Sequence, residues 1–127
     1  MQCPKCDSGE MVMVHNDGVR IDRCDHCHGL YFDQLTRQDL DLVAAHADQI
    51  DTGDENLGAE FDEMVYVECP RCYAIMDQRL LEEPVRIRFE ICIACHSTFL
   101  DAGEFREYLT PAYREHFAEL LPDDAGA

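Results

Sequence analysis

Eight cysteines, grouped as four Cys-x-x-Cys pairs in a chain of 127 residues, constrain this sequence more than any other feature. Seventeen residues separate the two pairs of the first set, and nineteen separate those of the second. Both spacings are typical of a four-thiolate zinc site, because cysteine pairs in tight turns can direct their sulfurs at one ion about 2.3 Å away. We therefore predict two structural sites, each with one Zn²⁺. The predicted ligands are Cys3, Cys6, Cys24 and Cys27 in the first site and Cys69, Cys72, Cys92 and Cys95 in the second.

Other metal or redox chemistry would use the same cysteines. The Cys-x-x-Cys-His runs at 24–28 and 92–96 match the pattern for haem attachment, but haem would leave both Cys-Pro-x-Cys pairs without a role. A rubredoxin-like iron site for electron transfer would use the same four thiolates, and spacing alone does not separate iron from zinc. Dithiol redox chemistry is not favoured, because no βαβ pattern surrounds the pairs.

The chain is a duplicated unit, which the matching positions of the two cysteine sets reveal. The segment 3–6 recurs at 69–72 with an offset of 66, and Val19-Arg20-Ile21 recurs as Val85-Arg86-Ile87 at the same offset. After two further residues, the segment 24–28 recurs at 92–96 with an offset of 68. We therefore expect two copies of one small fold.

Each copy is predicted to form a β-hairpin and a short third strand. In the first copy the turn signal Asp17-Gly18 separates two apolar runs, 11–14 and 19–23. In the second copy residues 85–91 alternate between apolar and polar, as a half-buried strand does. The third strands are expected at 30–32 and 98–100.

Helices are predicted after each third strand. Asp33 and Asp101 resemble helix N-caps. Apolar residues recur at helical spacing over 40–50 in the first copy. In the second copy a short helix over 105–109 should be followed by another over 113–121.

The sequence divides into three regions. We predict a first unit with its trailing helix at 1–47, an acidic linker at 48–63 and a second unit with trailing helices at 64–127. The linker contains seven acidic residues and no Lys or Arg, a composition typical of a solvated connection.

The net charge of −17, from 27 acidic and 10 basic side chains, argues against a nucleic-acid binder, since such binding depends on Lys and Arg. Any nucleic-acid contact is expected at Arg86 and Arg88, which alternate along one strand. No apolar run approaches the roughly 20 residues of a membrane helix, and the first residues lack the features of a signal peptide. We expect a cytoplasmic protein that does not associate with membranes.

No catalytic motif accompanies the cysteines. Ser8 and Ser97 are the only serines, and neither lies in a nucleophile motif. Nor does the sequence contain a phosphate-binding loop or a His-Glu-x-x-His run. His28 and His96 directly follow the last cysteine of each set, and we predict that they donate hydrogen bonds to ligand sulfurs. The protein is predicted not to be an enzyme and to have no small-molecule substrate.

The pattern Cys-Pro-x-Cys, hairpin, Cys-x-x-Cys-His, aromatic residue and Asp resembles the bacterial transcription factor IIB-type zinc ribbon family. The second copy is the closer match, because its segment 98–105 is similar to the family's Trp-Leu-Asp-x-Gly-Glu-Leu ending. The family's Trp is replaced by Tyr31 and Phe99. Glycine often follows the first cysteine pair in that family, whereas Asp7 and Tyr73 stand there in this chain, which argues against the usual left-handed turn.

The predicted fold class is a small, metal-stabilised α+β chain of two zinc ribbons, each followed by α-helix. The resemblance implies a transcription setting. We expect a non-enzymatic, zinc-binding adaptor that contacts another protein, such as RNA polymerase or another transcription component. The alternatives are a nucleic-acid-binding transcription regulator acting through the second ribbon and an iron electron carrier.

Overall fold

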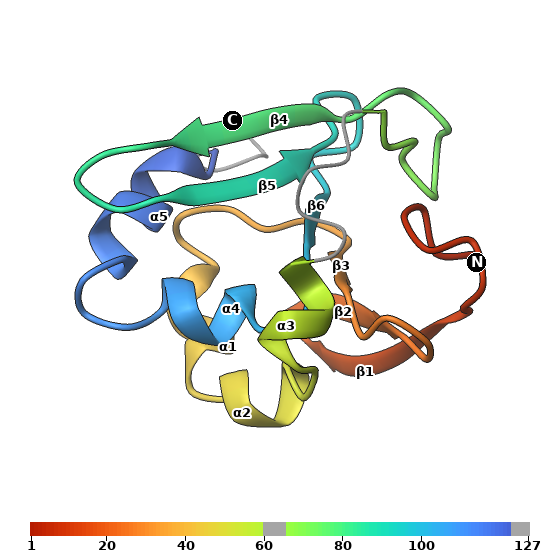
Figure 1. Cartoon of the computed structure of the whole chain (residues 1–127), viewed down its shortest axis with the longest axis horizontal. Helices are drawn as coiled ribbons and strands as arrows, with labels where there is room; N and C mark the ends of the chain where they lie inside the picture. The colour runs from red at the N-terminus through yellow and green to blue at the C-terminus, as the bar shows by residue number, and fades with distance from the viewer. Residues whose placement is uncertain (60–65, 123–127) are drawn as a thin grey trace.

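A computed structural model describes residues 1–59 and 66–122, and in these residues six strands form one antiparallel sheet in the order β1-β2-β3-β6-β5-β4 (Figure 1). Each copy of the repeat contributes a hairpin and a short third strand, as the sequence predicts. The strands are β1 Met11–Asp17, β2 Val19–Cys24, β3 Leu30–Phe32, β4 Asp77–Leu81, β5 Ile87–Ile91 and β6 Thr98–Leu100. Gly18, with a φ of 82°, closes the first hairpin at the predicted turn.

The two copies are joined through their third strands. Tyr31 of β3 lies opposite Phe99 of β6, and each of these residues occupies the same position in its own copy. On either side, Leu30 pairs with Leu100 and Phe32 with Thr98. The sheet therefore has an approximate two-fold axis between Tyr31 and Phe99, and the two ribbons are halves of one sheet.

The strand register corrects one detail of the repeat. Asp22 lies opposite Tyr31, and Glu90 lies opposite Phe99, so Asp22 and Glu90 are equivalent at an offset of 68. Arg20 is therefore equivalent to Arg88, and the match of 19–21 with 85–87 is wrong. The two extra residues belong to the turn before β5, because the cysteine ligands at its other end fix the register of the strand.

Within the described parts of the chain, five helices accompany the strands: α1 Leu40–Ala44, α2 Ala47–Ile50, α3 Glu55–Ala59, α4 Glu104–Tyr108 and α5 Arg114–Leu120. The two helices of the second copy lie within one residue of their predicted bounds, whereas the single helix predicted over 40–50 is interrupted. The run 40–50 is divided at His46, and the N-caps are Asp39 for α1 and Gly103 for α4 in place of Asp33 and Asp101. Gly103 adopts a φ of 85°, a conformation that glycine tolerates without strain. None of the helices in the described residues is long and apolar enough to cross a membrane.

Two hydrophobic clusters each draw residues from both copies, and the larger one contains no cysteine. Its buried residues include Ile21 and Phe32 from the first copy and Phe89 and Phe105 from the second. The rings of Phe32 and Phe105 lie 5.0 Å apart and join the two copies directly. Figure 1 shows α4 of the second copy beside α2 of the first. Neither copy therefore encloses a complete core of its own.

Residues 48–59, expected as part of a solvated linker, pack against the second copy. The carboxylate of Asp51 is buried and accepts hydrogen bonds from the backbone N–H groups of Gly103 at 2.9 Å and Arg106 at 3.1 Å. Gly58 lies so close to Ala102 that an added Cβ atom would stand 2.1 Å from its carbonyl oxygen. Sequence analysis could not predict this packing, because a buried carboxylate that accepts backbone hydrogen bonds cannot be distinguished by sequence from an exposed one. Residues 60–63 of the expected linker lie outside the described residues.

Candidate metal centres

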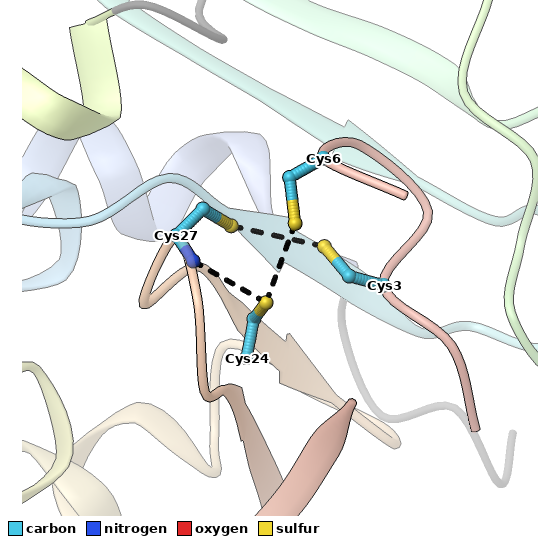
Figure 2. A group of neighbouring side chains, drawn as sticks. All are labelled: Cys3, Cys6, Cys24 and Cys27. Carbon is cyan, nitrogen blue, oxygen red and sulfur yellow. Dashed lines mark hydrogen bonds between the residues drawn. The ribbon is translucent and has the colours of Figure 1, made fainter. Parts of the chain in front are cut away.

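The first four-cysteine cluster brings its sulfur atoms together from two loops (Figure 2). The Sγ atoms of Cys3 and Cys27 are 3.7 Å apart, and those of Cys6 and Cys24 are 3.5 Å apart. All four sulfurs lie within 4.8 Å of one another. A tetrahedron with zinc–sulfur bonds of about 2.3 Å has edges of about 3.8 Å, and a disulfide needs about 2.05 Å, so the spacing fits four ligands around one ion.

The second cluster repeats this arrangement in a more open setting. The Sγ atoms of Cys72 and Cys92 are 3.6 Å apart, and the four sulfurs again lie within 4.8 Å of one another. Cys69 and Cys92 are buried, Cys95 is half-buried and Cys72 is exposed. In the first cluster three of the four cysteines are buried. Both donor sets fit zinc, because four thiolates match its preferred ligands and tetrahedral geometry.

Each Cys-x-x-Cys pair ends in a left-handed residue, which turns the chain back around the sulfurs. These residues are Asp7, His28, Tyr73 and His96, with φ values between 57° and 65°. The expectation that Asp7 and Tyr73 would not adopt the left-handed turn is therefore wrong. The turn is fixed by a backbone hydrogen bond, such as that from Tyr73 N to Cys69 O at 2.9 Å, and non-glycine residues occupy it at modest strain.

His28 and His96 thus have a clear role in the backbone of their turns. In the described residues the Nδ1 atom of His28 is buried and makes no hydrogen bond. The hydrogen bonds from these two imidazoles to sulfur stay a prediction.

Before a metal ion binds, the sulfurs of each cluster differ in how readily they lose their protons. A hydrogen bond from Cys27 lowers the pKa of Cys3 to about 5, and the pKa of Cys27 is raised in turn. Burial raises the pKa of Cys24 to about 11. In the second cluster burial opposes ionisation of Cys69, yet hydrogen bonds to its sulfur lower its pKa to about 6. Each cluster therefore contains a thiolate at neutral pH that can make the first bond to a metal ion.

The second cluster includes a residue from the other copy, which the sequence interpretation missed. The hydroxyl of Tyr31, on β3, lies 3.7 Å from the Sγ of Cys69. The hydroxyl of Ser97 lies at the same distance from this sulfur. Phe99, the equivalent of Tyr31, has no hydroxyl to offer the first cluster. The only sequence signal was that one of two equivalent aromatic residues is a tyrosine.

A buried lysine joins the first cysteine loop to the second copy. The Nζ atom of Lys5, on a side chain with no exposed surface, lies 2.8 Å from Glu90 and 2.9 Å from Asp101. Burial alone would lower the pKa of Lys5, but the two carboxylates raise it, so its ammonium group is charged. The equivalent pair, Arg71 and Asp33, is 2.7 Å apart, and the arginine side chain is 54% exposed. Sequence reasoning missed both pairs, because they connect positions in different copies.

Arg86 and Arg88 do not share an exposed face. Arg86 is exposed and precedes β5, whereas Arg88 is buried within β5, with a guanidinium nitrogen 3.7 Å from Glu90. The hydroxyl of Tyr108 accepts a hydrogen bond from Arg88 N at 3.2 Å. The alternation predicted that both arginines lie on a solvated face, but Arg88 is buried and its backbone contacts Tyr108 of α4. Of the two arginines, the structure leaves only Arg86 exposed for a contact with nucleic acid.

Comparison with known proteins finds a similarity to the first copy. Residues 2–44 match the sequence model of the transcription factor IIB-type zinc ribbon, described as a transcription factor zinc-finger. The match covers the first four-cysteine set, and the second set at 69–95 fits a second copy of the same fold. No curated protein and no solved structure matches the chain.

Proposed function

Because residues 2–44 match the sequence model of the transcription factor IIB-type zinc ribbon, we propose that this protein is a non-enzymatic adaptor that contacts another protein in a transcription complex. The observation that carries this proposal is the pair of four-sulfur clusters. Zinc with four thiolate ligands has no open position for water or substrate. Both sites would therefore stabilise the fold, and the function would depend on contacts made by the protein surface.

The charge of the chain supports a protein partner over a nucleic acid. A net charge of −17 repels the phosphate backbone and favours encounter with a basic surface. The buried position of Arg88 further weakens the alternative of a nucleic-acid-binding regulator. RNA polymerase or another transcription component is the partner that the family match favours.

Purification of a C-terminally tagged chain from its native cells, with and without nuclease, tests the adaptor function. We expect a stoichiometric protein partner from the transcription machinery that survives nuclease treatment. A chain with Cys69→Ser and Cys72→Ser serves as the control, since it lacks half of the second cluster and should lose the partner. Recovery of nucleic acid, or of partners that nuclease removes, would contradict the adaptor function and favour the nucleic-acid alternative.

Elemental analysis of the same preparation tests the metal. We expect two zinc ions per chain and no colour. One or two iron ions per chain, with the red colour of an iron–thiolate site, would instead support an electron carrier.

A further inference from the structure

A groove of about 430 Å³ lies between the two Cys-Pro-x-Cys loops, and both copies line it with equivalent positions. Pro4 and Pro70 are one such pair, and Asp7 and Tyr73 are another. Figure 1 shows the N-terminal loop beside the segment that precedes β4. The groove exists because the pairing of β3 with β6 brings the two loops together.

The groove combines acidic groups with aromatic rings. Asp7 and Glu68 line it together with the exposed rings of Tyr66 and Tyr73. In the described residues no Lys or Arg side chain lines it, and the α-amino group of Met1 lies 3.3 Å from the carboxylate of Glu10. Loading with zinc would add negative charge, because four thiolates outweigh the charge of Zn²⁺. A groove with this lining favours a cationic side chain, and tyrosine rings also attract guanidinium groups.

Beside the groove, the second zinc-site loops carry an apolar surface that the first ones lack. Tyr73, Ile75 and Ile93 are exposed to 73%, 54% and 62%. The equivalent positions in the first copy are acidic and exposed. Asp7 follows Cys6 as Tyr73 follows Cys72, and Asp25 follows Cys24 as Ile93 follows Cys92. Glu10 pairs with Gln2 in an isolated β-bridge, as Ile75 pairs with Glu68. The same backbone thus presents carboxylates in one copy and apolar side chains in the other, and exposed apolar clusters mark contact sites.

We propose that these features form one docking surface for a partner segment in which basic residues stand next to large apolar ones. A basic side chain enters the groove between Asp7 and Glu68, and the neighbouring apolar side chains pack on Ile75 and Ile93. Tyr73 lines the groove, and Ile75 pairs in an isolated β-bridge with Glu68, which also lines it, so exposed apolar residues adjoin the groove. This proposal rests on the adaptor function and specifies the chemistry of the partner.

Fluorescence anisotropy with labelled peptides tests the docking surface on the zinc-loaded full chain. The main probe is a peptide of four Arg-Leu-Ser repeats. One comparison peptide replaces arginine by glutamate, and another replaces leucine by serine. We expect the first peptide to bind, the serine peptide to bind more weakly and the glutamate peptide not to bind.

Two pairs of substitutions separate the parts of the surface. Asp7→Asn with Glu68→Gln removes the groove charges, and asparagine tolerates the left-handed turn. Tyr73→Asn with Ile93→Asn removes the apolar side chains without adding charge, and asparagine also tolerates the left-handed turn at position 73. Each pair should weaken binding of the Arg-Leu-Ser peptide by roughly 3–10-fold. The control, Asp17→Asn with Glu82→Gln, removes two charges at the far ends of the hairpins and should leave binding unchanged.

Equal binding of the arginine and glutamate peptides, or no binding of either, would overturn the docking surface. So would retention of full affinity by both variant pairs. The native partner from the purification above provides a separate check. If it remains bound to the Tyr73→Asn, Ile93→Asn chain, the adaptor function stands and the contact lies elsewhere. If no protein partner is recovered from cells, the adaptor function itself fails, whatever the peptides do.

Discussion

The ammonium group of Lys5 lies 2.9 Å from the carboxylate of Asp101, which belongs to the other copy of the repeat. The equivalent pair, Arg71 and Asp33, runs in the opposite direction across the two-fold axis. The basic residue of each Cys-Pro-x-Cys loop therefore forms an ion pair with the aspartate that follows the third strand of the other copy. The two ion pairs differ in environment, one being buried and the other largely solvated, so they offer a comparison within one molecule.

Replacement of Lys5 by methionine should destabilise the zinc-loaded protein by about 3–5 kcal/mol, because Glu90 and Asp101 stay buried without this cation. The same change at Arg71 should reduce the free energy of unfolding by about 1 kcal/mol or less, since that pair is partly exposed to solvent. Denaturant unfolding of both variants measures the difference. Equal losses at the two positions would contradict the role assigned to burial.

Removal of the Tyr31 hydroxyl should weaken the second metal site and leave the first unchanged. Tyr31→Phe eliminates a hydrogen bond to the sulfur of Cys69, and loss of such a contact typically reduces metal affinity about 10-fold or more. Chelator competition measures the affinity, and cadmium NMR of the substituted protein assigns the change to one site. Ser97→Ala, which removes the other hydroxyl, is the matched comparison. A change at the first site would contradict this assignment.

Zinc binding should release protons and weaken as the pH falls. The raised pKa values of Cys24 and Cys27 mean that both hold protons in the metal-free first site at neutral pH, and the same applies to Cys92 and Cys95 in the second. Since a metal ion must displace at least two protons per site, apparent affinity should fall by at least about 100-fold for each unit of pH lost.

The apparent zinc affinity should fall more steeply with pH once Cys69 and Cys3 also become protonated. That point lies near pH 6 for the second site and near pH 5 for the first, because Cys69 and Cys3 become protonated there. Zinc titration followed by a pH indicator counts the protons released. A release of fewer than two per site would contradict the protonation states described above.

Loss of one metal site should unfold both copies. Cys69→Ser with Cys72→Ser removes two ligands of the second site, and the hydrophobic core joins residues of both ribbons. We expect the amide signals of residues 1–59 to collapse to the narrow range of an unfolded chain in NMR spectra. Retention of a folded first ribbon would show that the shared core is dispensable for it.

Gly58→Ala should destabilise the fold by about 1–3 kcal/mol, because the new methyl group would meet the backbone of Ala102. Asn56→Ala, at an exposed position of the same helix, serves as the control and should have little effect. Thermal unfolding of both variants measures the difference. A neutral Gly58→Ala would mean that residues 48–59 do not pack closely against the second copy.

The sequence predicts the structure within each ribbon better than it predicts how the two ribbons pack together. The spacing of the cysteines identifies the residues that the structure gathers into clusters, and Asp17-Gly18 predicts the first hairpin, because both signals are local. The pairing of Tyr31 with Phe99 joins residues 68 positions apart, and nothing local distinguishes a third strand that pairs from one that stays at an edge. The burial of Lys5 and Asp51 depends on that union, so their charges appear in sequence as ordinary surface charges.

Pairing of a strand with its own equivalent is the geometry of a symmetric homodimer, in which one surface patch meets itself. In such a dimer any substitution would appear twice, on both sides of the axis. In this chain the two halves are joined covalently, so each position can be changed alone. Tyr31 could keep a hydroxyl that Phe99 lacks, and Tyr73 could become apolar while Asp7 stayed acidic. The fusion thus turns a symmetric scaffold into one with two distinguishable sides, and a surface with distinguishable sides can receive another molecule in a single orientation.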